Sequence, residues 1–161
     1  MIPAKAARTS TRASARSVLP ASADMSVAPL QAIPSLLREF GVEPWSVLER
    51  AGVDRGALAD ASSRVPFDLV GRLIVECVAA SACPHFGLLL GIRSGPAAAG
   101  IAGHLFRHAE SVHAALRLFI AHLHLHDRGG VVALNLHGAE DVELSYLIHH
   151  PNTPGTAQIL D

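Results

Sequence analysis

The chain has 161 residues, of which half are apolar, and its formal net charge is -1. This length and composition suit one globular domain with an ordinary core, and no apolar run approaches the roughly 20 residues needed to cross a bilayer. The two cysteines are too few for a disulfide framework, so we expect reduced thiols and a cytoplasmic protein.

Charge is distributed unevenly along the chain. Residues 1–24 carry four basic side chains and one acid, whereas residues 25–161 carry nine basic and 13 acidic side chains. Duplex DNA is bound by clustered Lys and Arg, so the acidic part of the chain is expected to bind DNA poorly. Residues 1–24 lack apolar periodicity and are predicted to be a disordered basic extension. An organellar transit peptide and a start site at Met25 are the alternatives.

Two short helices are predicted at 33–40 and 44–51. Each is followed by a glycine and a valine, with the glycines at Gly41 and Gly52. Glycine tolerates the left-handed conformation, and the apolar residue after it folds back on the last turn. The sequence therefore predicts two Schellman-type helix ends.

A longer helix is predicted at 67–80, where apolar residues recur at helical spacing. Before it, Asp54 is expected to cap a short turn. After it, we expect a short helix at 84–90 and a loop over 91–100, which contains a Gly-Pro pair.

Two further helices are predicted at 101–109 and 112–125. Ser111 stands directly before the second helix, where a hydroxyl side chain caps free N–H groups. Each helix carries one apolar stripe, so both are expected to pack against other elements.

The hydrophobic period changes to two after Gly130, which predicts strands at 131–137 and 142–149 joined as a hairpin. A lone hairpin is marginal in water, so it should be part of a larger, incomplete sheet. The predicted fold class is α+β: an N-terminal helical region followed by an antiparallel β-hairpin, with any sheet lying only after Gly130.

The ten histidines are the main candidates for chemistry, because the sequence has no phosphate-binding glycine loop, no nucleophile elbow and no zinc-ribbon cysteines. His104 and His108 lie four residues apart, as do His122 and His126, and such pairs on a helix face can bind a metal. For the first pair, a ligand cavity and ordinary surface positions are the alternatives.

His122, His124 and His126 occupy the last turns of a predicted helix, where imidazolium groups interact well with free carbonyls. This structural role is favoured over metal binding, because a metal site also needs oriented supporting partners and Asp127 is the only nearby acid.

No enzyme is predicted, since the acids lie mostly on exposed faces or near turns: Glu39, Glu49, Asp68, Glu76, Glu110, Glu140 and Asp141.

Four segments in order resemble the N-terminal effector-sensing domain of AraC-type transcriptional regulators, in the branch often labelled arabinose-binding. They are LLREFGVEPWSVLERAGVD (36–54), RVPFDLVGRLIVECVAASACPHFGLLLGIR (64–93), GIAGHLFRHAESVHAALRLFIAHLHLHDRGG (100–130) and VELSYLIHHP (142–151). The resemblance runs from about residue 30 to the end of the chain.

The resemblance implies a bacterial regulator in which this domain senses a small-molecule effector and forms a homodimer, while a C-terminal pair of helix-turn-helix motifs reads DNA. Those motifs are missing here, so residues 25–161 are expected to be a partial sensing domain. A metal-responsive binding protein that uses His122, His124 and His126 is the alternative. No cofactor and no membrane partner are expected.

The family label names arabinose, but family members respond to amino acids, lipids and other metabolites, so the label does not set the ligand. A pocket between the 101–124 helices and the hairpin is expected to have apolar walls with a few polar groups. Its candidate lining residues are His104, His108, Phe119, His122 and Tyr146.

Overall fold

The computed structural model describes residues 23–137, 141–148 and 153–160. The helices, with η marking 3-10 helices, are Ala28–Ala32 (η1), Ile33–Glu39 (α1), Pro44–Ala51 (α2), Arg55–Leu58 (η2), Phe67–Ser81 (α3), Phe86–Ser94 (α4), Pro96–Ala99 (η3), Ile101–Arg107 (α5), Val112–His126 (α6) and Thr156–Leu160 (α7). The strands are Asp24–Ser26 (β1), Arg64–Pro66 (β2), Gly130–His137 (β3) and Asp141–Ile148 (β4).

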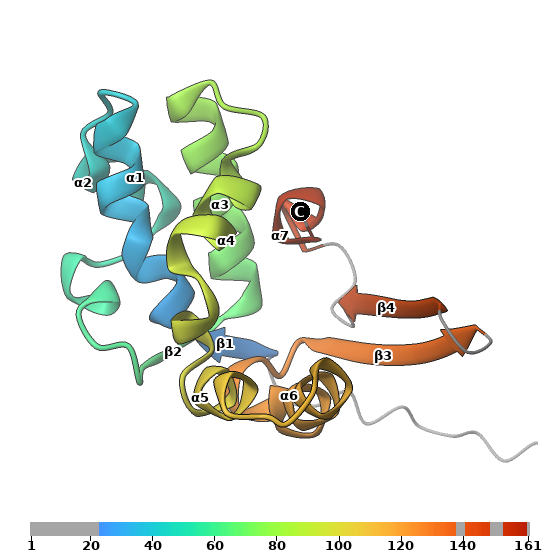
Figure 1. Ribbon diagram of the computed structural model, residues 1–161. Coiled ribbons are helices and arrows are strands. Elements are labelled where there is room, and N and C mark those ends of the chain that lie inside the picture. The colour runs from blue at the N-terminus through green and yellow to red at the C-terminus, as the bar shows by residue number, and fades with distance from the viewer. Residues whose placement is uncertain (1–22, 138–140, 149–152, 161) are drawn as a thin grey trace, which may run out of the picture.

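These elements form three parts, as Figure 1 shows. Helices α1–α4 form a bundle, α5 and α6 form a layer below it, and the β3–β4 hairpin extends to one side above α6. The short β1–β2 ribbon lies between the bundle and the α5–α6 layer. The predicted α+β class is confirmed.

The core lies within the helical bundle. Leu37, Leu48, Leu73 and Phe86 come from α1, α2, α3 and α4, and each is at most 1% exposed. Burying a large apolar side chain contributes roughly 1.5–3 kcal/mol, so these contacts hold the four helices together. The predicted helices at 33–40, 44–51 and 67–80 are confirmed to within one residue.

Both predicted Schellman ends are present. Gly41 and Gly52 have φ values of 72° and 77°. The valine after each glycine donates its N–H to the carbonyl five residues earlier, at 3.0 and 2.8 Å. Asp54 directly precedes η2, as predicted, but the predicted cap is wrong because the Asp54 side chain makes no capping hydrogen bond.

The expectation that any sheet lies only after Gly130 is wrong. Strand β1 pairs with β2 in antiparallel register, with Met25 opposite Val65, and Met25 also forms an isolated bridge with Asp127. The predicted disordered extension, residues 1–24, is wrong at Asp24, because this residue lies in β1. Residues 1–22 lie outside the described part of the chain. A three-residue strand has too few positions to show a period of two, which is why the sequence pattern missed this ribbon.

The predicted loop over 91–100 is also wrong for most of its length. Helix α4 continues through Gly91 to Ser94, and η3 follows directly. Glycine costs only about 1 kcal/mol in a helix interior. The last turn is also held by Ser94, whose Oγ donates to the carbonyl of Pro29 at 2.8 Å.

The segment 153–160, which includes α7, packs closely against α3 and α4. Figure 1 shows α7 beside these two helices. A Cβ atom on Gly71 would lie 2.2 Å from the carbonyl oxygen of Pro154, and one on Gly87 would lie 1.9 Å from that of Gln158. Both glycines are therefore required for this contact. The Gln158 side chain accepts from the N–H of Gly87 at 3.0 Å and donates to the carbonyl of Pro84 at 2.7 Å.

Within the described ranges, no single helix is long and apolar enough to cross a membrane. Helices α3 and α4 meet the length and hydropathy requirement only as a pair, and they bend by 110° at the break between them.

Candidate ligand-binding site

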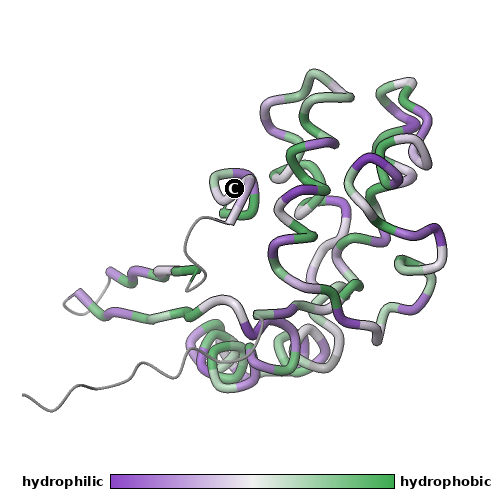
Figure 2. The backbone as a smooth tube through the Cα atoms, turned by 180° about the vertical axis from the view of Figure 1, so that it is seen from behind, coloured by the Kyte–Doolittle hydropathy of each residue, from purple (hydrophilic) through white to green (hydrophobic). Residues whose placement is uncertain are grey.

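Helix α6 and strand β3 form the two walls of the candidate site. Ser111 caps α6 as predicted, because its Oγ accepts the N–H of Ala114 at 3.1 Å. Strand β3 pairs with β4 over its whole length, with Val132 opposite Tyr146 and Leu134 opposite Leu144. Figure 2 shows hydrophobic and hydrophilic residues alternating in the outer half of the hairpin.

The turn between α6 and β3 is held by a buried carboxylate. Asp127 is 5% exposed, and its Oδ1 accepts the N–H groups of Gly129 at 2.6 Å and Gly130 at 3.1 Å. Its Oδ2 accepts the hydroxyl of Tyr146 on β4. Burial raises the pKa of Tyr146 and the bond to Asp127 raises it further, so the hydroxyl stays protonated as a donor. These bonds fix β3 and β4 relative to the end of α6.

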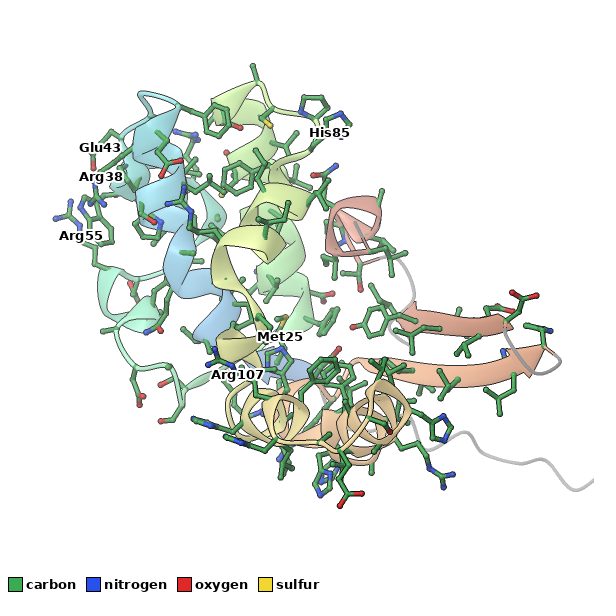
Figure 3. All side chains as sticks on the ribbon, viewed as in Figure 1. Met25, Arg38, Glu43, Arg55, His85 and Arg107 are labelled. Atoms are coloured by element: carbon green, nitrogen blue, oxygen red, sulfur yellow. The ribbon has the colours of Figure 1, made fainter. Side chains whose placement is uncertain are left out.

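The same end of α6 is joined to the N-terminal ribbon. Arg64 on β2 donates from Nε to the carboxylate of Asp24 at 2.7 Å and from Nη1 to the carbonyl of Leu125 at 2.8 Å. The N–H of Arg128 donates to the carbonyl of Asp24 at 2.9 Å. Figure 3 shows Met25 at this junction, between the bundle and the α5–α6 layer.

A hollow of about 480 Å³ lies between α6 and β3. Pockets that bind small molecules measure about 300–1,000 Å³ and have apolar walls with a few polar groups. The side chains that line this hollow are His113, Arg117, Ile120, Ala121, Val132, Ala133, Leu134 and Leu136. It therefore has the size and the apolar character of a ligand site.

The two polar side chains of the hollow come from successive turns of α6. His113 and Arg117 are four residues apart, so they lie on one helix face, and both are exposed. No acidic residue is among the lining side chains. Within the described part of the chain, Arg117 takes part in none of the ion pairs, which involve Arg50, Arg64, Arg93, Arg128 and His137.

The five residues predicted from the sequence do not line this hollow. His104 on α5 and His108, directly after this helix, are exposed, and their rings are stacked 6.4 Å apart. Phe119 and His122 are half-buried on α6, and His122 Nδ1 forms a 2.8 Å hydrogen bond with the carbonyl of Leu118. Tyr146 contacts Asp127 instead. Their role in ligand binding stays a prediction.

The hollow lies where the sequence led us to expect a pocket, but on a neighbouring face of α6. His113, Arg117, Ile120 and Ala121 are spaced four, three and one residues apart, which is the spacing of one helix face. That spacing was present in the sequence. The paired histidines carry the stronger chemical signal in the sequence, and they lie outside this hollow.

The described residues give no support to the alternative of a metal site at His122, His124 and His126. His126 lines a separate hollow with Arg64 and Gly100, while His124 faces another one beside Arg128. Among the residues with described positions, no three His, Cys, Asp or Glu side chains are grouped so that they could hold a metal ion.

An apolar hollow with a few polar groups is the usual form of a small-molecule site. Residues 41–160 match the family described as the arabinose-binding domain of AraC transcription regulators, N-terminal, and the chain belongs to this family. It is thus a ligand-sensing domain of an AraC-type regulator, in a family of regulatory rather than catalytic domains. None of the curated proteins compared with the chain matches it.

Proposed function

We propose that the hollow between α6 and β3 is the effector site of this sensing domain, that the domain forms a homodimer, and that the parent regulator reads DNA with a part outside these 161 residues. The observation that supports the site is the apolar hollow itself. It combines a volume of about 480 Å³ with six aliphatic side chains and two polar ones, His113 and Arg117.

Capture of metabolites tests the effector site. The purified chain is incubated with a bacterial metabolite extract, separated from free compounds, denatured, and its retained compounds are identified by mass spectrometry. We expect Ala121→Trp to abolish retention, because the indole fills a hollow lined by Ala121. Ala79→Trp is the matched control, since Ala79 is exposed in the last turn of α3. Retention that is equal in wild type and Ala121→Trp contradicts the assignment.

Exposed apolar side chains on β4 support the proposed homodimer. Val142, Leu144 and Leu147 are 53%, 51% and 66% exposed, on a strand whose outer edge pairs with no described strand. Val142 and Leu144 lie on one face of β4 and Leu147 on the other. A second copy that pairs its β4 with this edge would satisfy the free backbone groups and place its own side chains beside the apolar side chains on both faces.

Sedimentation equilibrium tests the dimer. We expect Leu147→Lys to raise the dimer dissociation constant at least about tenfold, because a charge would be placed in an apolar contact, where desolvation is costly. Leu88→Lys, on the exposed side of α4, is the control and should leave the dissociation constant unchanged. A monomeric wild type, or equal effects of the two substitutions, would contradict the β4 interface.

A further inference from the structure

We infer that the effector is a small organic acid, with an apolar body that lies on Ile120, Val132 and Leu134 and a carboxylate that binds Arg117. This inference rests on the proposed effector site. It specifies the chemical class of the ligand and excludes a free sugar.

The walls of the hollow require an apolar body. Six of its eight lining side chains are aliphatic, and Leu136 is 61% exposed. A ligand that covers these side chains gains roughly 25 cal/mol for each Å² of apolar surface removed from water. A sugar would place several hydroxyl groups against the same walls, where they lose water and find few partners.

The charge of the lining favours an anionic group. Arg117 is the only charged side chain in the lining, His113 lies one turn away, and no acid compensates them. Arg117 forms no ion pair with any described residue. A guanidinium group presents two parallel N–H donors that match the two oxygens of a carboxylate, and such charge-assisted bonds are stronger than neutral ones.

Arg117 and the apolar side chains of α6 lie close enough for one molecule to contact both. Arg117 and Ile120 are three residues apart on the same helix face, about 4.5 Å along the helix axis. Strand β3 lies across from this face and supplies Val132 and Leu134. A carboxylate separated from a ring or chain by a few carbon atoms would therefore contact Arg117 and the apolar walls at once.

Calorimetry with three probes tests the inference: 4-phenylbutanoate, its neutral isostere 4-phenylbutanamide, and L-arabinose. In the wild type we expect the carboxylate to bind at least about tenfold more tightly than the amide, and more tightly than the sugar. Arg117→Gln should reduce the preference for the carboxylate to below about threefold. Arg107→Gln removes the same charge from α5 (Figure 3) at an exposed position, and it should keep the preference.

The outcomes separate this inference from the proposed site. Equal binding of acid and amide, lost in Ala121→Trp, would overturn the organic-acid inference and leave the effector site in place. Tighter binding of L-arabinose would also overturn it. If none of the probes binds, the inference falls, and the metabolite capture experiment alone decides whether the hollow is the effector site. A preference that survives Arg117→Gln would contradict the role of Arg117.

Discussion

Asp127 is a charged residue that is almost completely buried. Its carboxylate oxygens accept three hydrogen bonds that hold the turn between α6 and β3. Tyr146→Phe removes one of these donors and leaves the carboxylate in place. An unsatisfied buried polar group costs about 1–3 kcal/mol, so we expect the free energy of unfolding to fall by that amount. Urea denaturation followed by circular dichroism measures it. Ser145→Ala, one residue away on the opposite face of β4, should have less than half the effect.

His126 makes stability depend on pH. Burial lowers its pKa below the ordinary value of 6.5, Asp127 opposes this shift and Arg64 adds to it. The unfolded chain therefore takes up the proton first as pH falls. The folded state has its full stability at pH values above the pKa of His126 in the unfolded chain. It loses stability as the pH falls from that pKa toward the lower pKa of His126 in the folded state.

Melting temperatures at about pH 7.5 and about pH 5.5 measure this dependence. His126→Gln should lose less stability on acidification than the wild type does. His124→Gln changes an exposed histidine of the same helix and should behave as the wild type does. An equal loss in wild type and His126→Gln would show that another group causes the pH dependence.

At the scale of elements, the contact of α7 with α4 depends on one glycine. Gly87→Ala would place a methyl group 1.9 Å from the carbonyl oxygen of Gln158, so α7 must move away. We expect faster amide exchange in 156–160 and a loss of about 1–3 kcal/mol in unfolding free energy. Hydrogen–deuterium exchange with mass spectrometry follows both changes.

Gly91→Ala is the matched control, because Gly91 lies in the same helix and a Cβ there would have no heavy atom within 4 Å. Since alanine favours the helix by about 1 kcal/mol, this variant should be as stable as the wild type or more stable. If both variants show the same exchange in 156–160, the close contact at Gly87 does not control docking.

The elements that could be predicted from sequence are those with a strong local period. Helices at 112–125 and 101–109 and the two hairpin strands agree with the structure to within two residues wherever the structure describes them, because ten or so residues repeat one pattern. The β1–β2 ribbon could not be predicted, since its pairing joins positions about 40 residues apart. Likewise, nothing local to Gly87 indicates that Gln158 will cap the start of its helix.

The candidate site was predictable as a region and not as a set of residues. A helix followed by a hairpin indicated where a hollow would form, but which face of α6 turns toward β3 depends on the Asp127 turn. That turn is fixed by Tyr146 and by the close approach of Gly129 to the ring of Phe67, which are contacts between distant parts of the chain.

At the scale of the whole molecule, the charge balance predicts weak binding to DNA. After residue 24 the acidic side chains outnumber the basic ones, 13 to nine. We expect no operator-selective binding in a gel-shift assay at physiological salt, and any weak binding should fall steeply as salt rises. Tight, selective retention would place DNA reading within these residues.

The effector site between α6 and β3 is the central claim, and methyl NMR tests it most directly. The chain, labelled at Ile, Leu and Val methyl groups, is titrated with the metabolite fraction that it retains. We predict shifts for Ile120, Val132, Leu134 and Leu136, which line the hollow, and none for Val47, Leu48 and Leu73 in the bundle core. Shifts confined to the bundle, with the four lining residues unchanged, would contradict the claim.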